Sequence, residues 1–175
     1  SNVYALQASL LEIGIIAQLH HIVDQPTVMK QKIEQLLMYN DVLLFSGGVS
    51  KGKKDYMPEV LESLGVQKHF HRVKQRPGKP FWFGTSNNSK TVFAFPGNPV
   101  STYMCFYKYF IPWLSASMRI PYQQDMAILA EDFNFQPDLT YFLQVATSNQ
   151  NGKLVAQPVT GKGSGDFANL TLVDA

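Results

Sequence analysis

The chain of 175 residues is long enough for one hydrophobic core, with room for a small second module. Hydrophobic residues make up 45% and charged residues 16%, a composition that excludes a disordered chain. The formal net charge of +2 is too small to indicate nucleic acid or an acidic membrane as a partner. However, no acidic residue lies between Glu62 and Asp125, and this stretch has eight lysines and arginines. We therefore predict an electropositive surface suited to anionic ligands.

Cys105 is the only cysteine, so the chain cannot form an internal disulfide. It lies in an apolar, aromatic stretch, and we expect a buried, inert thiol rather than a nucleophile. The most apolar run, near Tyr103 to Leu114, is interrupted by Lys108 and Pro112 and is too short to span a bilayer. No signal peptide starts the chain, and we expect a cytoplasmic protein without a membrane partner.

The first part of the chain alternates between helical and strand patterns. Val3–Ile13 has apolar residues at helical spacing and is predicted to be a helix capped by Asn2. Ile15–Val23 is rich in β-branched residues and is predicted to be a strand. A second helix is expected from Pro26 to Asn40. The continuous apolar run Val42–Phe45 is typical of a strand buried on both faces of a parallel sheet.

The alternation continues after a polar turn. Tyr56–Leu64 is predicted to be a helix and His69–Lys74 a strand. Phe81–Phe83 and Thr91–Phe95 are expected to form a hairpin around a turn that contains two asparagines. A further helix is expected from Asn98 to about Ser115. Strands and helices in this order predict an α/β layered domain with right-handed crossovers.

From residue 121 onward the pattern is that of strands separated by turns. Met126–Asn134, Thr140–Ser148 and Leu154–Val159 are each predicted to be strands. We therefore expect two domains, an α/β domain over residues 1–120 and a small all-β domain over residues 121–175.

The first candidate site is the turn Ser46-Gly47-Gly48-Val49-Ser50, directly after the predicted buried strand. In open α/β sheets, ligands bind beyond the carboxyl ends of the strands. The two glycines permit positive φ angles and let backbone N–H groups approach an anion closely. Ser46 and Ser50 add hydroxyl donors. Taken alone, the motif is equally compatible with an ordinary tight turn.

The second candidate is the basic segment from Arg72 to Pro80. On a strand, Arg72, Lys74 and Arg76 would share one face, and the Pro77-Gly78-Lys79-Pro80 bend would present Lys79 beside them. Converging cations of this kind hold a phosphate or another oxyanion. The alternative is a solvated basic edge strand. The lack of acidic residues nearby in the sequence favours the anion site.

The third candidate, Pro96-Gly97-Asn98-Pro99-Val100-Ser101, joins a predicted strand to a predicted helix. Asn98 is a good helix cap, and Pro99 suits the first helical position. The exposed N–H groups and the helix dipole predict a second anion site. Ordinary capping is also sufficient to explain these residues.

Two isolated acids, Asp24 and Asp55, are expected in loops beyond strand ends. Carboxylates beside a phosphate site commonly hold Mg²⁺. Each acid could instead complement the positive end of the helix that follows it.

We predict no metal site from the four histidines, His20, His21, His69 and His71. Adjacent residues of a strand face opposite ways, so His20 and His21 cannot both bind one metal ion. His69 and His71 could share a face, but no third ligand is apparent.

The order and spacing of these motifs resemble the MoeA/gephyrin E-domain family. The segments that carry the resemblance are Asp41–Ser50, Asp55-Tyr56, Arg72–Pro80 and Phe95–Ser101. The resemblance covers residues 1 to about 119 and is looser afterwards, where it depends chiefly on Gly163-Ser164-Gly165. It implies an α/β fold with a three-layer, mostly parallel sheet of the molybdopterin-binding, MogA-like type. A small, incomplete all-β domain would follow.

The resemblance also implies a function in molybdenum cofactor biosynthesis, as a molybdopterin molybdenumtransferase. Members of this family insert molybdate into adenylylated molybdopterin (molybdopterin-AMP), release AMP, and use Mg²⁺ or another divalent cation. The implied partners are molybdopterin, molybdate, a second copy in a homodimer of the full-length protein, and the adenylylating enzyme of the same pathway.

Matched residue by residue, the family motifs imply catalytic roles for Asp24, Asp55 and Lys79, the two acids also as metal ligands. The implied substrate-binding residues are Ser46, Gly47, Gly48, Ser50, Arg72, Arg76, Lys79, Pro96, Gly97, Asn98, Pro99, Ser101 and Ser164.

The chain departs from the family pattern at several positions. Arg72 and Arg76 stand where the family usually has lysines, and Gln144 stands where it has an arginine. The family's first central strand and its N-terminal domains would precede residue 1. We therefore expect a fragment that carries the ligand loops without the whole active site. Two alternatives stay open, a molybdopterin adenylyltransferase with the same fold and a non-catalytic, gephyrin-like binding module.

Overall fold

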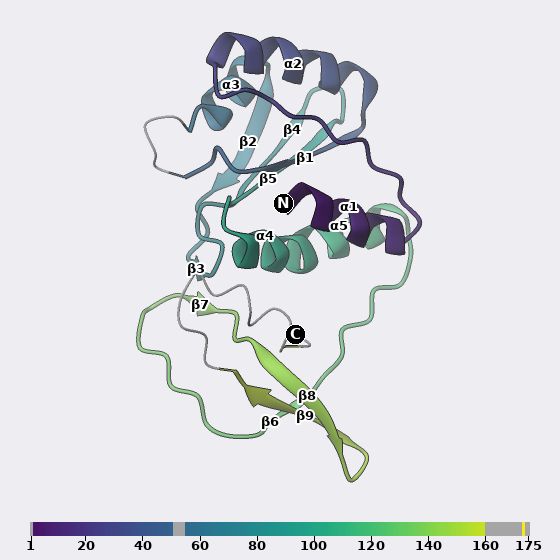
Figure 1. Ribbon diagram of the computed structural model, residues 1–175, viewed down its shortest axis with the longest axis vertical. Coiled ribbons are helices and arrows are strands. Elements are labelled where there is room, and N and C mark those ends of the chain that lie inside the picture. Colours follow the sequence, from purple (N-terminus) through teal and green to yellow (C-terminus); the bar gives the residue numbers. More distant parts are fainter. Residues whose placement is uncertain (1, 51–54, 160–172, 174–175) are drawn as a thin grey trace.

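The computed structural model describes residues 2–50, 55–159 and 173. In this part of the chain the α/β region has a four-stranded sheet in the order β1-β5-β4-β2 (Figure 1). The strands are β1 (Val42–Ser46), β2 (Val66–His71), β4 (Trp82–Ser86) and β5 (Thr91–Phe95). β1 and β5 are parallel, whereas β4 pairs antiparallel with β5 and with β2.

The predicted α/β class with parallel strands is confirmed. Within the described sheet, however, only the pair β1 and β5 is parallel, so the sheet is mixed rather than mostly parallel. The reason is the short Asn87–Lys90 connection between β4 and β5. Such a connection can only form a hairpin, and a hairpin makes its strands antiparallel.

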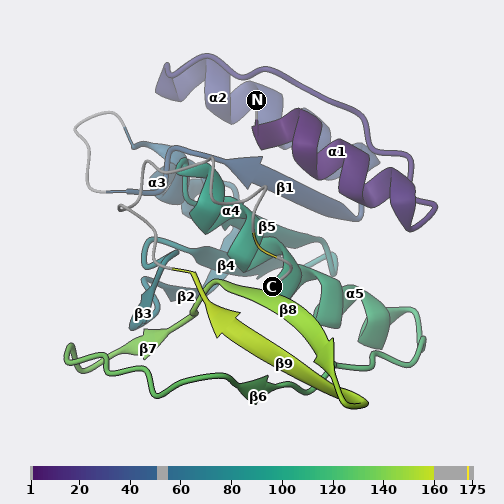
Figure 2. The ribbon, with the colours of Figure 1, turned by 60° about the horizontal axis from the view of Figure 1, so that its bottom comes forward.

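Helices cover both faces of the sheet, so the α/β region has three layers (Figure 2). On one face, α2 (Pro26–Tyr39) and α3 (Met57–Ser63) bury Ile33 and Leu61 against Leu43 and Phe45 of β1. On the other face, α1 (Asn2–Glu12) and the long helix after β5 pack against the aromatic side chains of the sheet. Alternation along β1 divides its side chains between the two cores.

The long helix after β5 has a π-helical middle. It consists of α4 (Pro99–Cys105), η1 (Phe106–Phe110) and α5 (Ile111–Ser117), which confirms the helix predicted from Asn98 to about Ser115. The N–H of Ile111 bonds to the carbonyl of Phe106, five residues back. Pro112 has no N–H and cannot make the regular helical bond, and the wider π turn accommodates it.

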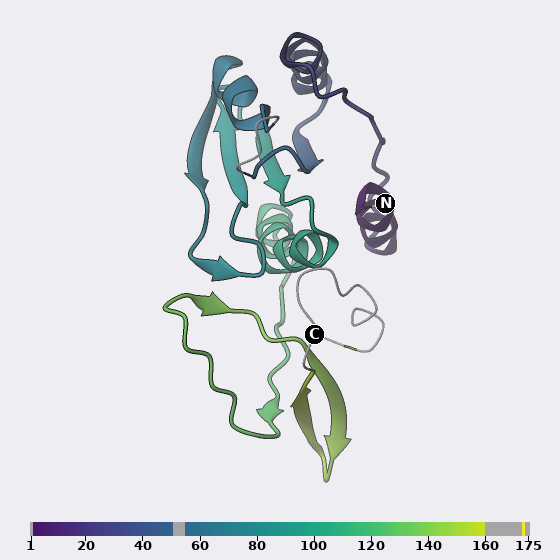
Figure 3. The ribbon, with the colours of Figure 1, turned by 60° about the vertical axis from the view of Figure 1, so that its left-hand side comes forward.

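The predicted strand over Ile15–Val23 is wrong. These residues form an extended segment that connects α1 to α2 beside the sheet (Figure 3). An extended backbone becomes a strand only when a neighbouring strand bonds to it, and among the described residues β1 bonds to β5 alone. Some of its apolar side chains still pack, with Ile15 in one core and Ile22 in the other, while Ile16 is 88% exposed.

The region after residue 121 has shorter strands than predicted. Its described strands are β6 (Ile128–Leu129), β7 (Thr140–Tyr141), β8 (Val145–Gln150) and β9 (Lys153–Pro158). β8 and β9 form a hairpin whose turn residues, Asn151 and Gly152, both have positive φ, as a type I′ turn requires. The predicted strand Thr140–Ser148 divides into β7 and β8, because β7 pairs with β3 (Gln75–Arg76) of the α/β region rather than with the hairpin.

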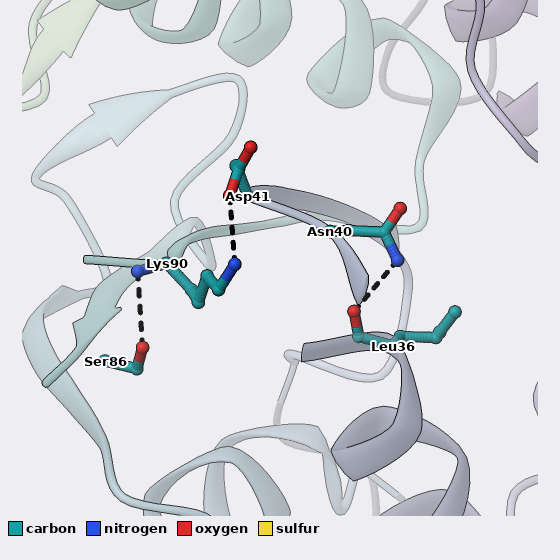
Figure 4. Close-up of polar contacts among 5 residues, drawn as sticks. All are labelled: Leu36, Asn40, Asp41, Ser86 and Lys90. Atoms are coloured by element: carbon teal, nitrogen blue, oxygen red, sulfur yellow. Dashed lines mark hydrogen bonds and ion pairs between the residues drawn. The ribbon is translucent and has the colours of Figure 1, made fainter. Parts of the chain in front are cut away.

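A shallow hollow of about 340 Å³ lies at the end of the sheet where β1 begins. It is lined by residues of α2 and of the β4–β5 turn, including Leu37, Met38 and Lys90. The Lys90 ammonium lies 2.9 Å from Asp41 Oδ1 and so links the β4–β5 turn to the residue that precedes β1 (Figure 4). The hollow is at the opposite end of β1 from Ser46, so it is not part of the predicted site.

Candidate anion-binding site

The first glycine loop, Ser46–Ser50, begins at the carboxyl end of β1. Gly47 has φ +95° and Gly48 has φ +73°, the left-handed conformations that the sequence predicted. A Cβ on Gly48 would lie 3.3 Å from Met57 Cβ, so space is also tight there. The Gly47 N–H donates to the Phe95 carbonyl at 3.0 Å, and Val49 is 1% exposed. The loop is thus held against β5 and anchored in the core.

The second glycine loop, Pro96–Ser101, begins at the carboxyl end of β5. Asn98 caps α4, and its Oδ1 accepts hydrogen bonds from the Ser101 N–H at 3.1 Å and the Ser101 hydroxyl at 3.2 Å. The capping interpretation of Asn98 and Pro99 is therefore confirmed. Gly97 stays exposed at the turn, where its backbone is open to solvent.

The two glycine loops contact one another because β1 and β5 are parallel neighbours. A Cβ on Gly97 would lie 3.6 Å from Gly47 Cα. The Asn2 side chain, at the start of α1, bridges the loops. Its Nδ2 lies 3.0 Å from Ser46 Oγ, 2.9 Å from the Gly97 carbonyl oxygen and 3.2 Å from Thr102 Oγ1. Sequence reasoning assigned Asn2 only as a helix cap and missed this role.

The strand predicted over His69–Lys74 is present only up to His71, so it does not extend into the basic segment. β2 ends at His71 because Arg72 has φ +68°, a left-handed conformation that interrupts an extended strand. The expectation that Arg72, Lys74 and Arg76 share one face of a strand is therefore wrong. The segment instead forms a loop that contains the two-residue strand β3. The loop is closed by bonds from Arg72 N–H to the Phe81 carbonyl and from Val73 N–H to the Lys79 carbonyl, both 3.0 Å long.

The buried side of this basic loop is fixed to the long helix. Gln75 is 2% exposed, and its Nε2 donates to the Gly78 carbonyl at 3.2 Å. The Tyr109 hydroxyl donates to Gln75 Oε1. A Cβ on Gly78 would lie 2.6 Å from Cys105 Sγ, so only glycine fits this close approach. Sequence reasoning missed Gln75 and Tyr109, because no periodic pattern marks a buried polar pair.

Cys105 is a buried thiol, as predicted. Burial raises the pKa of Cys105 to about 12, against a smaller opposing effect of its hydrogen bond with Gln75. Burial also raises the pKa of Tyr109, with a further contribution from the nearby Cys105. A thiol with such a high pKa is not a nucleophile at neutral pH.

Three ion pairs among the described residues account for part of the basic charge. Lys68 pairs with Glu62, Lys74 with Asp138 and Lys90 with Asp41. These pairs do not include Arg72, Arg76 or Lys79, whose side chains are exposed. Lys108 and Arg119 are outside these pairs as well, so five of the eight cations in the acid-free stretch have no ion-pair partner among the described residues. Arg72, Arg76 and Lys79 are the three of them that lie in the basic loop.

The two predicted acids lie in different surroundings. Asp24 is exposed in the loop before α2, and Asp55 is half-buried shortly before α3 and has an interaction of its own. Within the described ranges, no group of three His, Cys, Asp or Glu side chains is placed to hold a metal ion. Ser164 lies outside the described residues. Gln144 is half-buried, and its backbone carbonyl accepts a hydrogen bond from the Val159 N–H at 2.9 Å.

Residues 1–116 match the family model described as a probable molybdopterin binding domain, and the chain belongs to this family. Its resemblance to the MoeA group within that family is confirmed by individual relatives. The molybdopterin molybdenumtransferase of Synechocystis sp. (strain ATCC 27184 / PCC 6803 / Kazusa) is 43% identical over 173 residues, which is 97% of this chain and 42% of that protein. The protein of the same name from Bacillus subtilis (strain 168) is 28% identical over 163 residues, 91% of this chain and 38% of its own length.

The fold agrees with these sequence relationships. The crystal structure of a molybdopterin biosynthesis MoeA protein from Pyrococcus horikoshii superposes with a TM-score of 0.76 at 26% identity. The alignment covers 99% of this chain and 42% of that one. The chain thus spans about two fifths of the length of the relatives that it matches. None of the helices in the described ranges has the length and apolar character that a membrane crossing requires.

Proposed function

We propose that this chain is the molybdopterin-binding part of a molybdopterin molybdenumtransferase and acts in molybdenum cofactor biosynthesis. The observation that carries the proposal is the contact between the two glycine loops at the adjacent carboxyl ends of β1 and β5. Ligands of open α/β sheets bind at such an edge. The whole enzyme would insert molybdate into adenylylated molybdopterin and release AMP, the reaction implied by the family.

The proposed ligand is anionic through its phosphate groups, and the chain offers two kinds of group to receive them. The Ser46 hydroxyl and the left-handed backbone at Gly48 would provide donors for a phosphate, whereas the Gly47 N–H is already bonded to the Phe95 carbonyl. Arg72, Arg76 and Lys79 would supply positive charge from the neighbouring loop. His71 supports this juxtaposition, because its Nε2 lies 2.9 Å from the Val49 carbonyl oxygen and so connects the two loops.

We further propose that Asp24 and Asp55 bind Mg²⁺ together with the phosphate groups of the substrate. Proteins usually hold Mg²⁺ through one or two carboxylates, several waters and substrate phosphates, so a pair of acids fits this ion without a third protein ligand. When bound, the ion would neutralise charge on the pyrophosphate linkage that is cleaved. Asp24 and Asp55 would hold the ion, and Lys79 would stabilise the phosphate oxygens.

The proposal extends to the assembly and setting of the protein. The full-length protein would be a cytoplasmic homodimer, and exposed apolar side chains such as Tyr4 (67%), Leu11 (62%) and Ile16 (88%) support burial against further protein. An adenylylating enzyme of the same pathway would supply its substrate. We place the boundary between the α/β domain and the β domain near residue 120, which is supported by the family match ending at residue 116.

Calorimetric titration of the chain with molybdopterin, with and without molybdate and Mg²⁺, tests the proposal. We expect saturable binding that weakens as salt is added, because the contacts are between charges. Absence of binding by a folded chain would contradict the assignment of a working phosphate site to residues 1–175. Saturable binding of receptor-type peptides without any affinity for molybdopterin would instead support the non-catalytic, gephyrin-like alternative.

A further inference from the structure

The side-chain amide of Asn2 connects three acceptors that are far apart in the sequence. Its Nδ2 contacts Ser46 Oγ at 3.0 Å, the Gly97 carbonyl oxygen at 2.9 Å and Thr102 Oγ1 at 3.2 Å. The acceptors come from the carboxyl end of β1, from the second glycine loop and from the first turn of α4. One amide group therefore holds both glycine loops and the start of the helix together.

The direction of these hydrogen bonds follows from the chemistry of the partners. A carbonyl oxygen only accepts, so Asn2 must present its NH₂ group to Gly97. Thr102 has a single hydroxyl hydrogen, and it donates toward the Pro96 carbonyl at 2.6 Å and the Asn98 carbonyl at 3.0 Å. Thr102 Oγ1 is consequently an acceptor toward Asn2. The two amide hydrogens are shared among three acceptors, as in a three-centre hydrogen bond.

This arrangement determines what Ser46 can do. Its oxygen accepts a hydrogen bond from Asn2, so the hydroxyl hydrogen has to point elsewhere. Among the described residues, no acceptor takes that hydrogen from Ser46. The hydroxyl is thus left as a donor at the edge of the sheet where the glycine loops meet, and a donor is what an anionic ligand requires.

We infer that Asn2 is a positioning residue that holds the two glycine loops in contact and orients the Ser46 hydroxyl as a donor to the phosphate of the ligand. The identity of the ligand rests on the proposed function. The positioning role rests on the bonds of Asn2 themselves.

The test compares two amides of the same helix. Asn2→Leu keeps the approximate shape and removes the donors. Gln7→Met is the matched control, because Gln7 Nε2 donates to the Ala17 carbonyl at 2.9 Å, away from both glycine loops. In titrations with molybdopterin, we expect Asn2→Leu to weaken binding about tenfold, as for a lost hydrogen bond to a charged group, and Gln7→Met to leave it unchanged. Equal affinities of wild type and Asn2→Leu would overturn the inference.

A double-mutant cycle separates positioning from general stabilisation. If Asn2 acts through Ser46, then Asn2→Leu combined with Ser46→Ala should bind about as weakly as Ser46→Ala alone, with a loss of about tenfold. Losses that multiply would mean that Asn2 does not act through the Ser46 hydroxyl and would overturn its role in orienting that group. Asn2→Ala is measured in parallel, so that the result does not depend on leucine fitting at this position.

Failure of the proposed function can be recognised separately. If wild type does not bind molybdopterin, the ligand assignment is lost, and backbone amide hydrogen exchange of the ligand-free chain still tests the positioning role. Asn2→Leu should accelerate exchange in residues 46–49 and 97–102 together, whereas Gln7→Met should act only within residues 15–23. Unchanged exchange in both glycine loops of Asn2→Leu would contradict the role of Asn2.

Discussion

His71 Nε2 lies 2.9 Å from the backbone carbonyl oxygen of Val49. Because a carbonyl oxygen only accepts, the imidazole carries a proton on Nε2. His71 is the last residue of β2, and Val49 is the buried anchor of the first glycine loop. This bond therefore connects the start of the basic loop to the first glycine loop. It gives a role in the site to a histidine that sequence reasoning considered only as a metal ligand.

Replacing His71 by leucine should destabilise the chain and weaken molybdopterin binding. The Val49 carbonyl would lose its side-chain partner, at a cost of about 1–3 kcal/mol in the free energy of unfolding. His71→Gln places an amide N–H near the position of Nε2 and should retain most of the stability. Urea unfolding measures the difference. The control is His69→Leu, because His69 is exposed and its contact with Thr85 Oγ1 is also exposed, so stability should change by less than about 0.5 kcal/mol. Equal destabilisation by His69→Leu and His71→Leu would contradict the special role of the Val49 contact.

The double replacement Arg76→Ala and Lys79→Ala should weaken molybdopterin binding and leave the fold intact. Both side chains are exposed, so stability should change by less than about 0.5 kcal/mol. Each lost contact with a phosphate should reduce affinity by about tenfold or more. Lys74→Ala is the control, because the Lys74 ammonium pairs with Asp138 at an exposed position and contributes less than about 1 kcal/mol. Calorimetric titration measures both affinities. Equal affinities of the double variant and of Lys74→Ala would contradict a site at Arg76 and Lys79.

The parts of the fold that were predicted correctly depend on local chemistry. The run Val42–Phe45 predicted β1, and the glycines after it predicted the left-handed turn, because both signals lie within a few residues. The cap at Asn98 is equally local. Within β1 the prediction was less accurate. Leu43 and Phe45 are buried, whereas the neighbouring Leu44 is only half-buried, since burial depends on what covers each face.

The contacts that build the candidate site are long-range, and this explains why they were missed. Asn2 and Ser46 are 44 residues apart, and Lys74 and Asp138 are 64 residues apart. No periodicity records such pairs, so an acid-free stretch of sequence appeared to lack counter-charges that the fold supplies from elsewhere. The left-handed backbone of Arg72 was also missed. A positive φ is expected from sequence mainly at glycine, and this position is an arginine.

Tyr109→Phe should destabilise the basic loop more than a double replacement that also changes its partner. The Tyr109 hydroxyl donates to Gln75 Oε1, and Gln75 is 2% exposed. Removing the hydroxyl alone leaves a buried amide oxygen without its partner, at a cost of about 1–3 kcal/mol. Adding Gln75→Met replaces that polar group by an apolar side chain of similar size and should recover part of the loss. Urea unfolding of the single and double variants provides the comparison. A double variant that lost the full sum of both single effects would show that the two side chains are not coupled.

Stability should fall as the pH rises above the ordinary pKa of a thiol, and Cys105 should be a principal cause. Burial raises the pKa of Cys105 from 9.0 to about 12, so above pH 9 the unfolded chain releases a proton that the folded chain keeps. The contribution of this group is fully present below pH 9 and is lost up to about pH 12, with a slope of at most about 1.4 kcal/mol per pH unit. The raised pKa of Tyr109 acts in the same direction, so the measurement has to isolate Cys105. Urea unfolding from about pH 8 to about pH 11 should therefore show a smaller decline for Cys105→Ala than for wild type. Parallel curves for the two proteins would mean that Cys105 ionises as readily in the folded chain as in the unfolded one.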